Sequence, residues 1–480
     1  MGSLVGRAAE QHILRAAAQS AEAELIAVYG RRRVGKTFLI REYFGNAIVF
    51  ELTGVHGANL GEQLQGFSNV LGRALQSALI PAAPRDWQHA FQQLVAYLES
   101  LPRVKRKRVV FLDELPWLAS RRSGFLRAFE HFWNSWGVRR SDLIVVVCGS
   151  ASAWMVQRLL HARGGLHNRV TRRMRLEPFS LLETEQYFAS QKIQVGRYQT
   201  LELYMALGGI PYYLRQIERG ESAGVTIDRL CFARNGPLRD EFPRLYASLF
   251  EHAERYEQVV RALAAKPHGL TRTELIRSTQ LSSGGTASQL LEDLEQCGFI
   301  MRMPHFGLDT KEAVYRLIDE YSFFYLKWIE RHRGHAAHVW ITKRGAPAWR
   351  AWSGYAFEGI CLKHTASLKR TLGIEAVDTL ESTWQYRTGR EDERGAQVDL
   401  LIDRKDACIN LCEMKFAEAE FVIDKRCAEQ LRNMRETFRR VTGTRKALIL
   451  TLVTTYGLRD NQYGRELVDK SLDMNALFAS

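Results

Sequence analysis

The segment from Gly30 to Thr37 has residue types and spacing suited to holding phosphates. It is GRRRVGKT, which matches the pattern G-x-x-x-x-G-K-[ST], and it lies between an apolar run, Leu25 to Tyr29, and a helix-forming run, Lys36 to Tyr43. Glycines let backbone N–H groups turn toward phosphates, a lysine neutralises the outer phosphates, and a threonine hydroxyl binds magnesium. The alternative is a glycine loop with a chance lysine. The position between strand and helix favours a site for ATP and Mg²⁺, with these expected contacts: Gly30, Arg31, Arg32, Arg33, Val34, Gly35, Lys36, Thr37 and Phe38.

Two carboxylates end another apolar run, Val109 to Glu114 (VVFLDE). Asp113 is expected to bind magnesium together with Thr37. Glu114 is expected to orient or deprotonate the attacking water, which phosphoryl transfer requires. An Asp-Glu pair is a weak signal alone, but beside the phosphate-binding motif it favours hydrolysis over nucleotide binding without turnover.

A second set of residues that could bind a metal or take part in catalysis lies near the C-terminus. Asp399 is on one predicted strand, and Glu413 and Lys415 flank Met414 on the next, so that alternation places Glu413 and Lys415 on one face. With Glu358 from the preceding predicted helix, the carboxylates could bind magnesium and activate water for phosphodiester cleavage, with Lys415 as a catalytic residue. Two alternatives stay open: a surface strand pair with solvated charges, and a domain that binds DNA without cutting it.

The first part of the chain alternates predicted strands with helical segments, which indicates a doubly wound parallel sheet. The expected strands are Leu25 to Tyr29, Ile48 to Leu52, Arg108 to Leu112, Leu143 to Cys148 and Arg173 to Leu176. Residues Leu60 to Glu99 are expected to be helical cover. We expect this α/β domain to span residues 1–178.

The middle of the chain has a helical pattern. Ser180 to Glu183 and Thr271 to Glu274 have capping-box spacing, and the break at Gly208, Gly209 and Pro211 interrupts helices. We expect a helical lid at 179–250. Residues 251–330 are expected to be a winged helix-turn-helix, with a third helix at Ser282 to Cys297 and a hairpin of Phe299 to Met303 and Val314 to Ile318.

The third helix contains no lysine or arginine, which is unusual for a helix that reads a DNA groove. Its Ser283, Thr286, Ser288 and Gln289 could still contact DNA, with Arg302 and Lys311 on the wing. Protein contacts are the alternative role. The basic run Arg103 to Arg108 could bind DNA too, or simply form a solvated approach to its strand.

A last α/β domain is expected at 349–480. Its predicted order is helix Ala356 to Thr371, strands Gln397 to Ile402 and Ile409 to Met414, helix Ala428 to Arg439, and strand Lys446 to Val453.

Composition limits the class of protein. The chain has 480 residues, 46% apolar and 25% charged, which is typical of a multidomain soluble protein. No apolar run is long enough to cross a membrane and the start lacks a signal peptide, so we expect a cytoplasmic protein without a membrane partner. Its seven cysteines show no zinc spacing, and the net charge of +14 favours a polyanionic partner such as DNA.

These motifs together resemble the AAA+ superfamily, and specifically predicted prokaryotic ATPases that join an AAA+ module to a C-terminal domain. The resemblance covers nearly the whole chain. It implies that Val5, Gly6 and Arg7 lie near the adenine, that Cys148, Gly149 and Ser150 occupy a sensor position, and that GGIPYYL belongs to the lid. It implies an arginine finger, for which Arg169 in the segment Gly165 to Arg169 is the candidate, and hence a homo-oligomer. Nearby alternatives are Arg163, Arg172 and Arg173.

The C-terminal residues resemble the PD-(D/E)XK nuclease core, a restriction-endonuclease-like α/β fold. The resemblance implies a metal site at Glu358, Asp399 and Glu413, and gives Gln430 the place of a glutamine on the following helix. Two functions remain: an ATP-driven enzyme that acts on DNA through this domain, and an ATP-dependent regulatory switch whose C-terminal domain binds DNA or protein without cleavage.

Overall fold

The computed structural model describes residues 4–76, 80–102, 104–160, 168–281, 284–307, 312–332, 339–388 and 394–479. These residues form two compact units, which divide between Glu177 and Pro178. The finer division of the second unit into lid, winged helix and C-terminal domain remains a prediction. Within the ranges just given, no helix has the length and apolar character needed to cross a bilayer.

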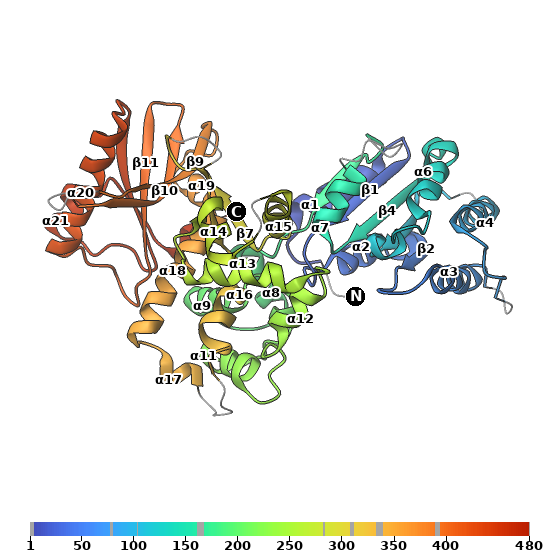
Figure 1. The fold of residues 1–480 in the computed structure, drawn as a ribbon, viewed down its shortest axis with the longest axis horizontal. Coiled ribbons are helices and arrows are strands. Elements are labelled where there is room, and N and C mark those ends of the chain that lie inside the picture. Colours follow the sequence, from blue (N-terminus) through green and yellow to red (C-terminus); the bar gives the residue numbers. More distant parts are fainter. Residues whose placement is uncertain are drawn as a thin grey trace. The chain divides into compact units, whose positions relative to one another are not determined.

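The first unit is built on a parallel sheet with the order β2-β3-β4-β1-β5 (Figure 1). Its strands are β1 (Glu24–Tyr29), β2 (Ile48–Thr53), β3 (Arg108–Asp113), β4 (Leu143–Gly149) and β5 (Arg172–Arg175). The sequence predictions of an α/β fold and of these five strands are confirmed to within two residues at each end. Strands β3 and β4 are buried along their whole length, because helices cover both faces of a parallel sheet.

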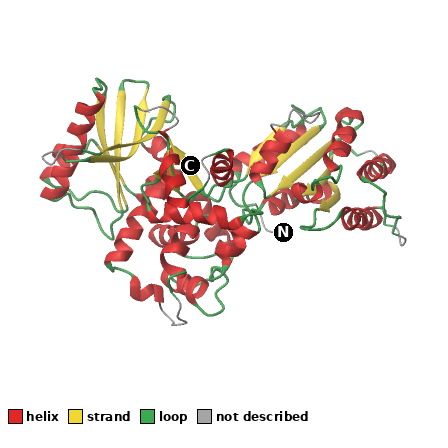
Figure 2. Cartoon of the chain, in the orientation of Figure 1, coloured by secondary structure: helices red, strands yellow, loops and turns green. Residues whose placement is uncertain are grey.

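Helices surround this sheet, and Figure 2 shows them in red beside the yellow strands. They are α1 (Ala8–Gln19), α2 (Lys36–Phe44), α3 (Leu60–Ala74), α4 (Trp87–Ser100), α5 (Leu115–Leu118), α6 (Phe125–Ser135) and α7 (Ser152–Met155). The expected helical cover at 60–99 is thus two helices. Aromatic side chains of α3, α4 and α6, such as Phe67, Phe91 and Phe129, pack into one core with Leu112 and Val145 of the sheet.

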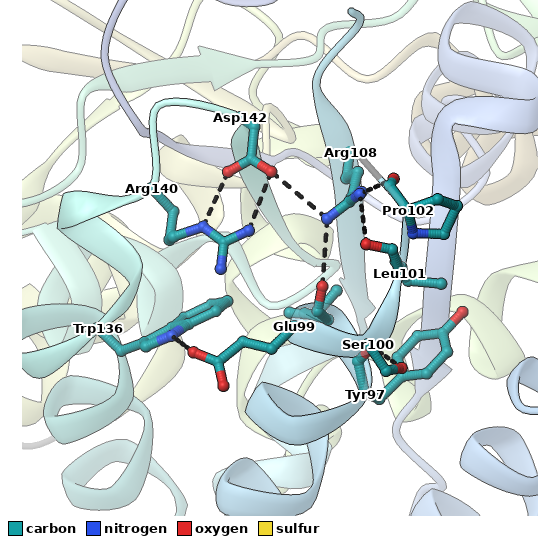
Figure 3. A network of polar contacts seen from close by, with 10 residues as sticks. Tyr97, Glu99, Ser100, Leu101, Pro102, Arg108, Trp136, Arg140 and Asp142 are labelled. Carbon is teal, nitrogen blue, oxygen red and sulfur yellow. Dashed lines mark hydrogen bonds and ion pairs between the residues drawn. The ribbon is translucent and has the colours of Figure 1, made fainter. Parts of the chain in front are cut away.

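A polar network fixes the start of β3 (Figure 3). The buried Arg108 donates to the carbonyl oxygens of Leu98 and Leu101, each at 3.1 Å, and to that of Pro102. It also contacts Asp142, which Arg140 binds with two hydrogen bonds. Arg108 therefore satisfies the free carbonyls at the end of α4. The basic run at 103–108 is therefore not solvated throughout, because Arg108 is buried, and Arg103 lies outside the described residues.

The second unit begins with helices. They are α8 (Leu181–Ser190), α9 (Arg197–Leu207), α10 (Pro211–Leu214), α11 (Ala223–Ile227) and α12 (Glu241–Ala247). The predicted capping box is present at Ser180 and Glu183, and α9 ends at Gly208, whose φ is 65°.

Three further helices and a small sheet follow in the second unit. The helices are α13 (Ala253–Ala265), α14 (Arg272–Thr279) and α15 (Gly285–Gln296), and the strands β6 (Leu270–Thr271), β7 (Ile300–Met303) and β8 (Val314–Leu317) form a sheet of order β6-β8-β7. The capping box at Thr271 and Glu274 is confirmed. The third helix begins at Gly285, later than expected, and Ser282, Ser283 and Lys311 lie outside the described residues.

A five-stranded sheet forms the last part of the chain, in the order β13-β12-β11-β10-β9. Its strands are β9 (Thr379–Tyr386), β10 (Ala396–Arg404), β11 (Cys408–Lys415), β12 (Ala447–Thr454) and β13 (Lys470–Leu472). Strands β9, β10 and β11 pair antiparallel, whereas β11, β12 and β13 pair parallel.

Helices α18 (Pro347–Lys363) and α20 (Lys425–Thr442) pack on this sheet, while α16 (Glu320–Phe324), α17 (Val339–Lys343), α19 (Thr365–Thr371) and α21 (Gln462–Leu467) complete the unit. The expected single helix Ala356 to Thr371 is wrong: α18 begins earlier, at Pro347, and the chain breaks at His364 before α19. Proline favours the first turn of a helix, so Pro347 was a readable start signal.

Candidate functional site

The segment from Gly30 to Gly35 links the end of β1 to the start of α2. Gly30 has a φ of 148°, and a Cβ there would lie 2.2 Å from the Leu176 carbonyl oxygen, so only glycine fits. Gly35 has a φ of 92° and caps α2, while Arg33 also has a positive φ of 72°. Positive-φ residues at these positions before a helix N-terminus allow backbone N–H groups to turn to one side, which suits an anion.

Lys36 and Thr37 open α2 and carry the polar side chains of this loop. The buried Lys36 Nζ donates to the carbonyl oxygens of Gly30 and Arg31, both at 2.9 Å. Thr37 Oγ1 donates to Asp113 Oδ2 at 2.8 Å, so the two expected magnesium ligands are side by side. Both are hard oxygen donors, and their convergence fits Mg²⁺.

Glu114 follows β3 with a φ of 50°, a left-handed conformation that is rare outside glycine. Its Oε2 accepts hydrogen bonds from Ser150 N at 3.1 Å and from Ser150 Oγ at 2.8 Å. Because β4 lies between β1 and β3, Ser150 stands between the phosphate-binding loop and Glu114. The structure thus brings the predicted sensor residue into contact with the predicted catalytic carboxylate.

The N-terminal segment also contacts the loop, since Arg7 Nη2 donates to the Val34 carbonyl oxygen at 3.2 Å. Among the other expected nucleotide contacts, Arg31 is buried and Phe38 is 55% exposed beside Thr37. Arg32 lies in the same turn. Sequence reasoning assigned Arg7 to the adenine but missed its contact with the loop backbone.

The candidate arginine finger, Arg169, is exposed in a turn before β5. Its neighbours Gly165 to His167, and the alternative Arg163, lie outside the described residues. Arg172 is bound to Glu24 at 3.0 Å, which makes it a poor candidate for reaching a neighbouring subunit.

The C-terminal residues predicted to do chemistry line one cavity of about 920 Å³. Leu401 of β10 lies opposite Leu411 of β11, and alternation from that pair places Asp399, Glu413 and Lys415 on one face of the sheet. The cavity is bounded on other sides by α18, which contributes Glu358, and by α20, which contributes Gln430.

Each carboxylate of the cavity has a partner within the protein. Asp399 Oδ2 accepts a hydrogen bond from Met414 N at 3.0 Å, and Glu413 Oε1 accepts one from Lys415 Nζ at 2.6 Å. Glu358 Oε1 lies 2.7 Å from Arg316 Nη1, an ion pair whose angles fall outside hydrogen-bond geometry. Among the described residues, no three His, Cys, Asp or Glu side chains are arranged to hold a metal ion, and the metal role of Glu358, Asp399 and Glu413 stays a prediction.

Burial and neighbouring charge shift the pKa values of this cluster. Burial raises the pKa of Asp399 well above its ordinary value, and the carboxylates of Glu413 and Glu358 raise it further. Burial by itself lowers the pKa of Lys415, but Glu413 and Asp399 outweigh that effect and the pKa is raised. The cluster therefore keeps Lys415 charged and favours a bound cation or proton at Asp399.

Comparison with known proteins finds a match for the part of the chain that contains the first of these two sites. Residues 4–217 match a family model described as an ATPase domain predominantly from Archaea. This segment of the chain is therefore similar to an archaeal-type ATPase domain. The matched segment includes the phosphate-binding loop, Asp113, Glu114 and Ser150, and the model that it matches describes ATPases.

Individual proteins are also similar to the chain. The uncharacterized protein MJECL04 of Methanocaldococcus jannaschii is 23% identical over 400 residues, 83% of each chain. The Walker-type ATPase paby2304 of Pyrococcus abyssi is 18% identical with a TM-score of 0.49, covering 68% of this chain and 96% of that one. The ORC2 protein of Aeropyrum pernix is 13% identical with a TM-score of 0.39, covering 67% and 91%.

Several cavity residues were not predicted from the sequence. Arg350, Arg394 and Arg426 are exposed residues that line the C-terminal cavity, and His268 reaches it from the loop before β6. Arg426, one residue into the helix that carries Gln430, could have been found from the expected fold. His268 had no sequence signal, because it comes from a distant segment.

Proposed function

We propose that the chain hydrolyses ATP, with Mg²⁺, and that its nucleotide state controls a DNA-directed C-terminal site of the PD-(D/E)XK nuclease type. The observation that carries this proposal is that Asp399, Glu413 and Lys415, from two strands, line one cavity together with Glu358.

Within the ATPase domain, the contacts support a role for each residue. Lys36 neutralises the outer phosphates, while Thr37 and Asp113 hold magnesium, which supplies charge neutralisation when bound. Glu114 accepts a proton from the attacking water, and Ser150 orients its carboxylate. The exposed Arg169 of a neighbouring subunit completes the site in a homo-oligomer. ATP turnover per subunit that rises with protein concentration in the wild type, but not in Arg169→Ala, would support this; equal behaviour would exclude it.

The order of elements in the C-terminal part supports the nuclease half of the proposal. Helix α18 precedes three antiparallel strands, and α20 then crosses to β12, which pairs parallel with β11. Asp399 lies on the second of these strands and Glu413 and Lys415 on the third. In this half, Lys415 helps to position or activate a water that attacks a phosphodiester bond.

Exposed arginines support a polyanionic substrate. Arg350, Arg394 and Arg426 line the cavity, and the chain carries a net charge of +14. Arginines can bind the phosphates of a strand whose scissile bond lies over the carboxylates. The exposed Thr286 and Ser288 of α15 would add a second contact with DNA.

A regulatory switch without cleavage is the second candidate. It is favoured by the engagement of all three carboxylates with Met414, Lys415 and Arg316, and by the lack of a ready metal cluster among the described residues. In that case the C-terminal domain binds DNA or protein and ATP changes assembly.

Cleavage of single- and double-stranded DNA with magnesium or manganese, with and without ATP, separates the two candidates. We expect cutting by the wild type and its loss in Asp399→Ala and Lys415→Ala. The control is Asp403→Ala, on the same strand but bound to Lys446 and outside the cavity, which should still cut. No cutting by the wild type, with ATP hydrolysis intact, would reject the nuclease in favour of the switch.

A further inference from the structure

The loop after β7 is docked on the C-terminal sheet. Thr383 N donates to the Pro304 carbonyl oxygen at 3.0 Å, and Phe306 N donates to the Thr383 carbonyl oxygen at 2.9 Å. Phe306 also packs against Phe438 of α20, with ring centroids 5.3 Å apart. We call the part of the chain from α13 to β8 the three-helix segment. These contacts join its hairpin, β7 and β8, to the edge strand β9.

A buried ion pair makes a second connection. Arg316 of β8 and Glu358 of α18 are both nearly fully buried, and Arg316 Nε also donates to the Pro267 carbonyl oxygen at 3.2 Å. Removing one partner of such a pair leaves an uncompensated buried charge. The pair therefore holds the loop at Pro267 against the wall of the C-terminal cavity.

His268, the next residue, projects into that cavity. Its Nδ1 lies 2.8 Å from Gln397 Nε2, and its Nε2 lies 3.4 Å from the Tyr355 hydroxyl. The Gln397 amide nitrogen can only donate, so His268 Nδ1 accepts and the neutral ring carries its proton on Nε2. The contact with Tyr355 is long, so this N–H remains able to donate to a ligand.

We propose that His268 is a substrate-contacting residue of the C-terminal cavity, where its Nε2–H donates a hydrogen bond to a phosphate oxygen of a nucleic-acid strand. The proposal rests on the nucleic-acid function proposed for this cavity. Gln397 is two residues before Asp399 on β10, so the hydrogen bond between Gln397 and His268 fixes the imidazole beside the carboxylate cluster.

The position of His268 also gives the three-helix segment a role at the site. The cavity is lined both by the acidic cluster and by exposed arginines from α18, from α20 and from the chain before β10. His268 adds a neutral hydrogen-bond donor from a different segment. Because the ring is uncharged, it can bind a phosphate oxygen without forming an ion pair with the carboxylates, as a cationic side chain would. The segment from α13 to β8 thus contributes a residue to the lining of this cavity.

The test compares His268→Ala and His268→Gln with the wild type in the full-length protein. The probe is a fluorescein-labelled single-stranded DNA oligonucleotide, with affinity measured by anisotropy in EDTA and cleavage measured with manganese. We expect His268→Ala to weaken binding by roughly fivefold to tenfold, as expected for one lost hydrogen bond, and His268→Gln, which keeps an N–H donor, to recover most of it.

The matched control is His305→Ala. His305 lies in the same segment, but its Nε2 accepts from Gln385 N and it does not line the cavity, so affinity should stay within about twofold of the wild type. Wild-type affinity in His268→Ala, with melting temperatures unchanged, would overturn the inference while leaving the proposed function intact. If the wild type binds DNA without cutting it, the nuclease function is rejected, but the affinities of the variants still test the role of His268. If the wild type binds no DNA, both the proposed function and the role of His268 are overturned.

Discussion

Ser150 donates two hydrogen bonds to one oxygen of Glu114, from its backbone N–H at 3.1 Å and its hydroxyl at 2.8 Å. Glu114 has a left-handed backbone conformation, which is strained for a residue other than glycine and persists where surrounding contacts hold it. Ser150 can therefore transmit changes at the end of β4 to the residue that is expected to activate water.

Replacing Ser150 by alanine removes one of these two hydrogen bonds. We expect Ser150→Ala to lower the kcat for ATP hydrolysis by about tenfold, with ATP affinity unchanged, because a misplaced general base loses part of its contribution. Steady-state turnover and nucleotide titration measure the two quantities separately. Ser100→Ala is the control, because its hydroxyl donates to the Tyr97 carbonyl oxygen, away from the loop. An unchanged kcat in Ser150→Ala would show that Ser150 does not position Glu114.

Lys36 and Glu114 should affect different steps of the ATPase reaction. Lys36→Ala should weaken ATP binding by roughly a hundredfold, because about 3 kcal/mol of charged contacts is lost. Glu114→Gln should bind ATP normally but stop hydrolysis. Titration with a fluorescent ATP analogue and a phosphate-release assay measure these effects, with the exposed Lys105→Ala as control. Tight ATP binding by Lys36→Ala would contradict the site.

Local signals were sufficient for much of this architecture. Buried strands such as Leu143–Gly149 follow from continuous apolar runs, and the capping boxes at Ser180 and Thr271 follow from the spacing of two side chains. The grouping of Glu413 and Lys415 follows from alternation along one strand. Such features depend on neighbours in the sequence, which a single chain displays.

Contacts between distant segments could not be predicted in this way. The pairing of Arg316 with Glu358 and the entry of His268 into the cavity depend on how the hairpin docks on β9. The break at His364 has the same origin, because its ring binds Ile360 within α18 and Leu181 near the start of α8. Arg108 is a similar case. It belongs to a charged run in the sequence, but in the structure its side chain binds a carbonyl oxygen near the end of α4.

Gly30 lies so close to the Leu176 carbonyl oxygen that adding a single methyl group should strongly reduce stability and ATP binding. Gly30→Ala would place a Cβ 2.2 Å from the Leu176 carbonyl oxygen at a φ of 148°, so the loop or β5 must move. We expect a loss of about 3 kcal/mol in the free energy of unfolding, and loss of ATP binding. Chemical denaturation and nucleotide titration check both effects.

Gly66 provides the contrasting substitution. It lies within α3, and a Cβ there would meet no atom within 4 Å. Gly66→Ala should therefore raise stability by up to about 1 kcal/mol, as alanine favours a helix over glycine. Equal stability of Gly30→Ala and Gly66→Ala would contradict the conclusion that only glycine fits at position 30.

The buried His364 should make stability depend on pH. Its Nδ1 lies 2.8 Å from the Ile360 carbonyl oxygen and its Nε2 accepts from Leu181 N at 3.0 Å, which requires the neutral ring. Burial lowers the pKa of His364 from 6.5 to about 4. Between these values the unfolded chain binds a proton that the folded chain does not, so stability falls as pH decreases from 6.5 to about 4.

The difference between the two pKa values corresponds to about 3 kcal/mol, of which about 2 kcal/mol is lost between about pH 6.5 and about pH 5. Urea denaturation at about pH 7 and about pH 5 measures this loss. His364→Gln, which hydrogen bonds without titrating, should lower stability at about pH 7 but reduce its decline toward about pH 5. His252→Gln, at a site 65% exposed, should retain the wild-type decline. The same decline in His364→Gln as in the wild type would show that other groups control the acid stability of this unit.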